Sequence, residues 1–108
     1  MKIYNNLVRD RILEMIEADH KNCITRKVEG HELRNLLEEK MIEEFNEYLE
    51  DRNLEELADM LEVLIGLAKY NGYTEEELMH IRMKKYQARG GFEEGVFLES
   101  VTIKKESW

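Results

Sequence analysis

Four acidic residues recur at helical spacing in two neighbouring stretches of the sequence. Glu44 and Glu47 lie three residues apart in the first stretch, and Glu56 and Asp59 lie three apart in the second. Residues three apart in an α-helix project from nearly the same face, so each stretch is expected to present a pair of carboxylates. Four such groups in one small volume repel one another unless a cation neutralises them. The pattern therefore predicts a cation site.

The ligand chemistry of this site indicates which cation it would hold. Carboxylate oxygens without Cys or His ligands favour Mg²⁺, or alternatively Mn²⁺, over Zn²⁺. Glu43 adjoins the first pair and is a candidate for an additional contact. The alternative interpretation is an ordinary solvated helix surface, because glutamate is a good helix former and 37% of the residues are charged. The spacing alone leaves both interpretations open.

The elements that must position these residues are helices. The chain has no proline, and its apolar residues recur three and four positions apart, which favours an all-α fold. We expect four principal helices, over about residues 8–19, over 32–50, from near 53 to a turn at 71–72, and from 74 to about 89. A connection of only a few residues makes the second and third helices antiparallel neighbours. Both acidic pairs then lie near the same turn.

Helix capping and burial give further expectations for the third helix. Asn53 with Glu56 forms a capping box, as do the residues at 74–77 before the fourth helix. Capping is also a purely structural explanation of Glu56. Residues 57–68 are apolar nearly all round, so they predict a helix that is buried on most faces. Asp59 on such a helix needs a partner.

The length and composition indicate one domain that is completed by assembly. A chain of 108 residues with 43% apolar content fits a single domain over residues 1–108. Residues 23–26 and the tail from residue 92 are candidates for short strands. Four helices with a wide apolar surface predict an antiparallel bundle that completes its core as a homodimer or homotetramer.

Charge and hydropathy exclude some partners. A formal charge of −8 and a pI near 5.0 argue against unspecific nucleic-acid binding, which needs a broad excess of Lys and Arg. The longest apolar run, residues 63–68, is far shorter than the ~20 residues of a spanning helix. The lone Cys23 forms no internal disulfide, and no secretion signal is apparent. We therefore expect a cytoplasmic protein with no nucleic-acid or membrane partner.

A cationic stripe on the fourth helix is a candidate phosphate site. Arg82, Lys85 and Arg89 recur three and four residues apart, and Gly90 and Gly91 follow, where the backbone can approach a ligand closely. These side chains are candidates to bind the phosphates of a substrate. The alternative is that they stabilise the C-terminal end of the helix dipole and pair with surface acids.

Five stretches of the chain together resemble a known enzyme family. They are "EEFNE" and "EELAD" around the acidic pairs, "YNNLVRDRI" at residues 4–12, "LADMLEVLIGLAK" at 57–69 and "IRMKKYQARGGFEEGVFLE" at 81–99. Their order and spacing resemble the MazG-like all-α nucleoside triphosphate pyrophosphohydrolases, a superfamily that includes phosphoribosyl-ATP pyrophosphohydrolase. The likeness is to a short, single-domain house-cleaning branch and covers almost the whole chain. The gap between the acidic pairs is shorter here than in many members, which affects the expected pocket size and substrate.

The resemblance implies a reaction and a set of roles. It implies hydrolysis of a nucleoside triphosphate between the α- and β-phosphates, giving a monophosphate and pyrophosphate, at a site near a subunit interface. Glu44, Glu47, Glu56 and Asp59 would hold Mg²⁺, and Glu44 or Glu47 would orient or deprotonate the attacking water. The competing function is a non-enzymatic helical dimerisation or adaptor module. Arg9 and Asp10 are open to either a structural or a site role.

Overall fold

A computed structural model describes residues 1–105 of the chain, and it is all-α. Its helices are α1 (Ile12–Ala18), α2 (Gly30–Asp51), α3 (Leu54–Tyr70) and α4 (Glu75–Arg89). The predicted fold class and the four helices are therefore confirmed. Within the described residues no strand forms, so the short strands left open at residues 23–26 and in the tail are not present there.

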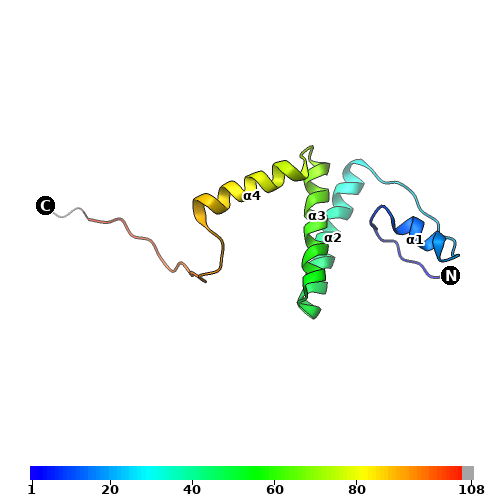
Figure 1. The fold of residues 1–108 in the computed structure, drawn as a ribbon, viewed down its shortest axis with the longest axis horizontal. Coiled ribbons are helices and arrows are strands. Elements are labelled where there is room, and N and C mark those ends of the chain that lie inside the picture. The colour runs from blue at the N-terminus through cyan, green and yellow to red at the C-terminus, as the bar shows by residue number, and fades with distance from the viewer. Residues whose placement is uncertain (106–108) are drawn as a thin grey trace.

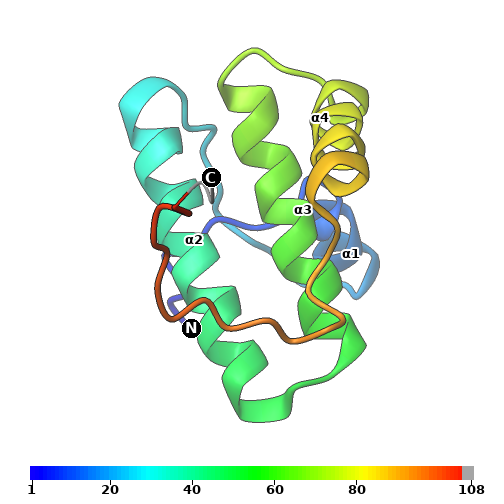
Figure 2. The same cartoon turned by 90° about the vertical axis from the view of Figure 1, so that its left-hand side faces the viewer.

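The centre of the fold is the antiparallel pair α2 and α3 (Figures 1 and 2). A very short turn joins the two helices. Arg52 adopts the left-handed conformation (φ 48°, ψ 37°), and its backbone N–H donates to the carbonyl of Tyr48 at 2.6 Å. The side chain of Asn53 then accepts a hydrogen bond from the backbone N–H of Glu56 at 2.9 Å, so the predicted cap is confirmed. The turn places the start of α3 against the end of α2.

The two helices pack closely toward the other end of the pair. A Cβ atom on Gly66 would lie 3.3 Å from Cδ2 of Leu37, so glycine permits this approach. Val63 and Ile65 on α3 are the buried apolar side chains among the described residues. The hydrophobic contact between α2 and α3 therefore holds the acidic helices in register.

The rest of the chain extends away from this pair. In Figure 1, α4 and the tail lead to one side, whereas α1 lies on the other. The radius of gyration is 20.2 Å and the principal extents are 79 × 32 × 22 Å, whereas a compact domain of this length has a radius of gyration of about 13 Å. A single chain therefore leaves most of its apolar surface uncovered.

One sequence prediction about α3 is wrong for the single chain. Residues 57–68 were expected to be buried on most faces, but Leu57, Leu61 and Leu64 are 45%, 44% and 46% exposed. The reason is that α3 packs mainly on one neighbour, α2, and these leucines stay exposed in the part of the chain that the structure describes.

The first helix is shorter than the periodicity predicts. The expected helix began at residue 8 and ended at 19, but α1 begins at Ile12 and ends at Ala18, without a side-chain cap at Arg11. The chain before it is engaged elsewhere, since Asn6 accepts a hydrogen bond from Lys40 Nζ at 3.3 Å and Arg9 binds Asp59. These polar contacts favour an extended segment over an earlier start of the helix.

The other helix bounds agree more closely with the sequence. α2 begins two residues before the expected residue 32 and ends one after residue 50. The N-cap of α4 is confirmed, because Thr74 Oγ1 accepts from the backbone N–H of Glu77 at 3.0 Å. Glu77 contacts the Thr74 hydroxyl, which donates to its carboxylate at 3.2 Å, and no bond to the backbone N–H of Thr74 completes the box among residues 1–105. None of the helices within residues 1–105 has the length and hydropathy to cross a bilayer.

The Asn53 cap provides a test of the turn between α2 and α3. We expect Asn53→Ala to lower the free energy of unfolding by about 1 kcal/mol, because the backbone N–H of Glu56 loses its acceptor. Urea denaturation followed by circular dichroism measures this change. Asn53→Asp is the matched control, since a carboxylate at the same position also accepts the hydrogen bond and should retain the stability. Equal stability of the Ala variant and the wild type would contradict this account of the turn.

Candidate metal site

Glu44 is the centre of a cluster of carboxylates contributed by α2 and α3. One group contains Glu43, Glu44 and Glu47, and a second contains Glu44, Glu56 and Asp59. In each group one oxygen from every residue lies within 4.8 Å of the others. The structure thus brings the four sequence-predicted acids together as two overlapping groups that share Glu44.

The burial of two carboxylate oxygens separates this cluster from an ordinary acidic surface. Glu44 is only 7% exposed, whereas Glu56 and Asp59 are half-buried and the other acids of the cluster are also more exposed than Glu44. Among residues 1–105, the Oε2 atoms of Glu44 and Glu56 are both buried and have no hydrogen-bond partner. A carboxylate oxygen that is removed from water without a donor destabilises the folded state. The two oxygens and the all-carboxylate ligand set fit a hard divalent cation such as Mg²⁺ or Mn²⁺.

The electrostatics of the cluster agree with this interpretation. Burial is the main cause that raises the pKa of Glu44, and the negative charge of Glu47 raises it further. The pKa of Glu56 is raised in the same way, first by burial and then by the charge of Glu47. Both carboxyl groups therefore hold a proton more readily than an isolated glutamate does. A bound cation would reverse this preference.

Two basic side chains reach the edge of the cluster. Lys40 Nζ lies 3.3 Å from Glu43 Oε1 and 3.7 Å from Glu44 Oε1. Arg9 Nη2 lies 2.6 Å from Asp59 Oδ1. With all five acids of the two groups ionised, these two positive charges leave three negative charges without a counter-ion among the residues in contact. A divalent cation would neutralise two of these three negative charges.

Sequence reasoning did not identify Lys40 and left the role of Arg9 open. Lys40 precedes Glu43 and Glu44 by three and four residues, and this helical spacing was a usable signal. The contact of Arg9 with Asp59 joins residues 50 positions apart. No local pattern predicts such a contact.

The cationic stripe on α4 does not reach the cluster within one chain. Glu56 and Asp59 lie at the start of α3, whereas α4 follows the end of α3 and leads away from the pair (Figure 1). Among residues 1–105, no ion pair or hydrogen bond joins Arg82, Lys85 or Arg89 to an acid of the cluster. A site that uses both groups needs a second copy of the chain.

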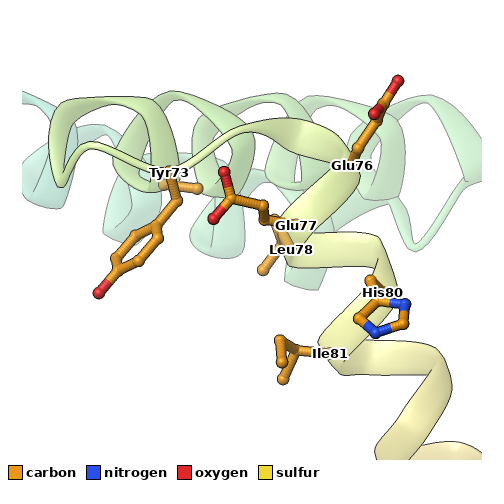
Figure 3. A pocket seen from close by; sticks show the side chains of 7 residues that line it. Tyr73, Glu76, Glu77, Leu78, His80 and Ile81 are labelled. Atoms are coloured by element: carbon orange, nitrogen blue, oxygen red, sulfur yellow. The ribbon is translucent and has the colours of Figure 1, made fainter.

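A hollow away from the acidic cluster lies at the start of α4. It occupies about 860 Å³ where α4 leaves α3, and Figure 3 shows Tyr73, Glu77 and His80 around it. Glu77 is engaged in the cap of α4. Since the acidic cluster contributes no residue to its lining, this hollow is separate from the candidate metal site.

A comparison of the chain with known proteins finds no matching family model, and no curated protein or solved structure that matches it. The argument for a metal site therefore rests on the geometry, burial and charge of the cluster itself.

The raised pKa values predict how the stability of the metal-free protein depends on pH. The folded protein binds protons more tightly than the unfolded chain at Glu44 and Glu56. The free energy of unfolding should therefore rise as the pH falls from neutral through the raised pKa values. The rise should end when the pH nears 4.5, the ordinary pKa of a glutamate carboxyl group. Thermal unfolding in the presence of a chelator, between pH 7.5 and 5, measures this trend.

Two glutamine variants separate this effect from the general loss of negative charge. Glu44→Gln should reduce the rise in thermal stability on acidification, because a neutral amide replaces the group that titrates. Glu39→Gln, at an exposed position on the same helix, is the matched control and should keep the full rise. The same pH trend in both variants would contradict the assignment to Glu44.

Proposed function

We propose that the protein is a metal-dependent nucleoside triphosphate pyrophosphohydrolase that removes unwanted nucleotides from the cellular pool. It would cleave the substrate between the α- and β-phosphates and release a nucleoside monophosphate and pyrophosphate. The observation that carries the proposal is the pair of buried carboxylate oxygens without partners, one on Glu44 and one on Glu56. The reaction itself follows from the resemblance of the motifs to the MazG-like enzymes.

The ligands of the metal are assigned from the geometry of the cluster. Glu44, Glu56 and Asp59 can each direct one oxygen to a common point, and Glu47 lies within the group that surrounds Glu44. We assign these four carboxylates to Mg²⁺, with Mn²⁺ as the alternative cation. When bound, the cation neutralises charge on the triphosphate and on the pyrophosphate that leaves.

A carboxylate of the cluster activates the attacking water in this proposal. The water oxygen forms a bond to one of the two phosphorus atoms that flank the scissile bridge, and the bond from that phosphorus to the bridging oxygen breaks. The proton of the water passes to Glu44 or Glu47, and the bond electrons stay with the departing phosphate oxygen. Glu44 and Glu47 are the candidates for this role because their carboxylates lie in one group at the proposed metal.

A second copy of the chain would complete both the core and the site. The exposed apolar residues of α3 follow a heptad pattern, and three exposed apolar residues of α2 continue the same kind of stripe. They are Leu54, Leu57, Leu61 and Leu64 on α3, and Ile42, Phe45 and Leu49 on α2. Such stripes are typical of a helix pair that packs against another pair. We therefore propose a homodimer or homotetramer.

Assembly also offers a role for the cationic stripe of α4. Because α4 leads away from its own acidic cluster, we propose that Arg82, Lys85 and Arg89 serve the site of a neighbouring copy. There they would bind the outer phosphates of the substrate. Arginine is well suited to this role because its planar guanidinium donates two hydrogen bonds to a phosphate.

Metal-dependent pyrophosphate release tests the proposed activity. We expect the wild-type protein to release pyrophosphate from some member of a panel of ordinary and modified nucleoside triphosphates with Mg²⁺, and not with a chelator. Asp59→Asn should lower turnover at least about 100-fold, because the metal loses a charged ligand. Glu55→Gln is the matched control on the same helix and should keep activity, since Glu55 is exposed and outside both carboxylate groups.

Failure of this experiment would favour the competing function. If no substrate is cleaved and Asp59→Asn binds metal no worse than the wild type, the cluster is not a catalytic metal site. The exposed apolar stripes of α2 and α3 would then be the main functional feature, and a dimerisation or adaptor module would account for them.

The proposed assembly has a separate test. We expect Leu57→Glu combined with Leu61→Glu to shift the protein to a monomer, because two buried charges would oppose helix packing at the interface. Size-exclusion chromatography with light scattering measures the molar mass. Ile24→Glu is the control, since Ile24 is 99% exposed and lies outside the helices. A monomeric wild-type protein at micromolar concentration would contradict the assembly.

A further inference from the structure

We propose that Arg9 has two successive roles at the acidic cluster. In the metal-free protein it is the counter-ion of Asp59, and after metal binding it leaves Asp59 and binds a phosphate of the substrate. This inference rests on the proposed function and adds a residue to the same site. The observation that carries it is the 2.6 Å ion pair between Arg9 Nη2 and Asp59 Oδ1.

The ion pair occupies a carboxylate that belongs to the candidate metal ligands. Asp59 forms one group with Glu44 and Glu56, whose ligand atoms lie within 4.8 Å of one another. A divalent cation held by these three carboxylates would carry twice the charge of a guanidinium. It would neutralise Asp59 in place of Arg9 and would repel the guanidinium. Metal binding and the Arg9–Asp59 contact should compete.

The exposure of the pair makes this exchange feasible. The side chains of Arg9 and Asp59 are 58% and 39% exposed, and exposed ion pairs contribute little net stability. Arg9 also lines a hollow of about 150 Å³ together with Ala58, Leu61, Glu62 and Ile65. The open space beside Arg9 is consistent with a side chain that can leave Asp59.

The hydrogen-bonding capacity of Arg9 fits a phosphate. Among residues 1–105, Asp59 is the one protein group that accepts a hydrogen bond from its guanidinium. A guanidinium has five N–H donors and binds phosphate oxygens in a fork. Arg9 thus lies beside a candidate metal ligand, and most of its N–H donors have no acceptor among residues 1–105.

The other basic groups of the same chain are less suited to this role. Lys40 is only 19% exposed and already contacts Glu43, Glu44 and the side chain of Asn6. The basic residues of α4 lie away from the cluster in the same chain. Arg9 is therefore the mobile cation that each chain supplies to its own site.

Metal binding without substrate tests the first role. We expect Arg9→Ala to bind Mn²⁺ roughly 3- to 10-fold more tightly than the wild type in isothermal titration calorimetry, because a competing cation has been removed. Arg11→Ala is the matched control. Arg11 is also exposed and pairs with Glu14, outside the cluster, so its loss should leave Mn²⁺ affinity unchanged.

Binding of inorganic tripolyphosphate with saturating Mn²⁺ tests the second role, and it does not depend on the identity of the base. Arg9→Ala should bind tripolyphosphate roughly 10-fold more weakly than the wild type, whereas Arg9→Lys should lose less, since it keeps the charge but not the fork. Tighter binding of Mn²⁺ together with weaker binding of tripolyphosphate, both in Arg9→Ala, would identify the two roles of Arg9. A purely structural ion pair would lower the folding stability of Arg9→Ala without tightening metal binding.

A measurement on the wild-type protein covers the case in which the alanine variant folds poorly. The side-chain Nε–H signal of Arg9, followed by NMR, should shift during titration with Mg²⁺ and shift again with tripolyphosphate, whereas the signal of Arg11 should not. If the wild type binds Mn²⁺ and Arg9→Ala behaves like Arg11→Ala, the inference about Arg9 is wrong and the metal site stands. If the wild type binds no Mn²⁺, the proposed function and this inference both fail.

Discussion

One buried carboxylate, surrounded by other acids, is the electrostatic constraint on the helix pair. Glu44 on α2 is close to acids of both α2 and α3, and its Oε2 atom has no hydrogen-bond partner among residues 1–105. Burial and the charge of Glu47 raise its pKa, so the metal-free fold is electrostatically unfavourable at this point. A chain whose only task was to pair two helices would be more stable with an apolar residue here. Under the proposed function, a divalent cation would account for this buried carboxylate.

The hydrophobic contact between α2 and α3 holds this cluster in place. A tight turn at Arg52 and Asn53 sets the register, and the close approach at Gly66 and Leu37 fixes the other end of the pair. The same chain leaves wide apolar stripes uncovered and extends over 79 Å. The packed part of the molecule is thus the acidic helix pair, while many apolar side chains outside its contact stay exposed.

Local patterns predicted the parts of the molecule that depend on neighbouring residues. Apolar periodicity and the capping signals at Asn53 and Thr74 located the helices of the pair and α4, and the three-residue spacing of the acids identified the cluster. The start of α1 and the contact of Arg9 with Asp59 depend on groups distant in sequence, so no local pattern predicts them. The exposure of Leu61 was also missed, because periodicity shows that a face is apolar but not what covers it.

X-ray diffraction from crystals grown with Mn²⁺ tests the central claim most directly, because the anomalous signal of manganese locates the ion independently of any assay. The account predicts an anomalous peak within coordination distance of carboxylate oxygens of Glu44, Glu56 and Asp59, with Arg9 no longer paired to Asp59. The crystals should contain Mn²⁺ at a concentration that saturates known magnesium enzymes. A map without a peak at the cluster, in which Arg9 still contacts Asp59, would contradict this account.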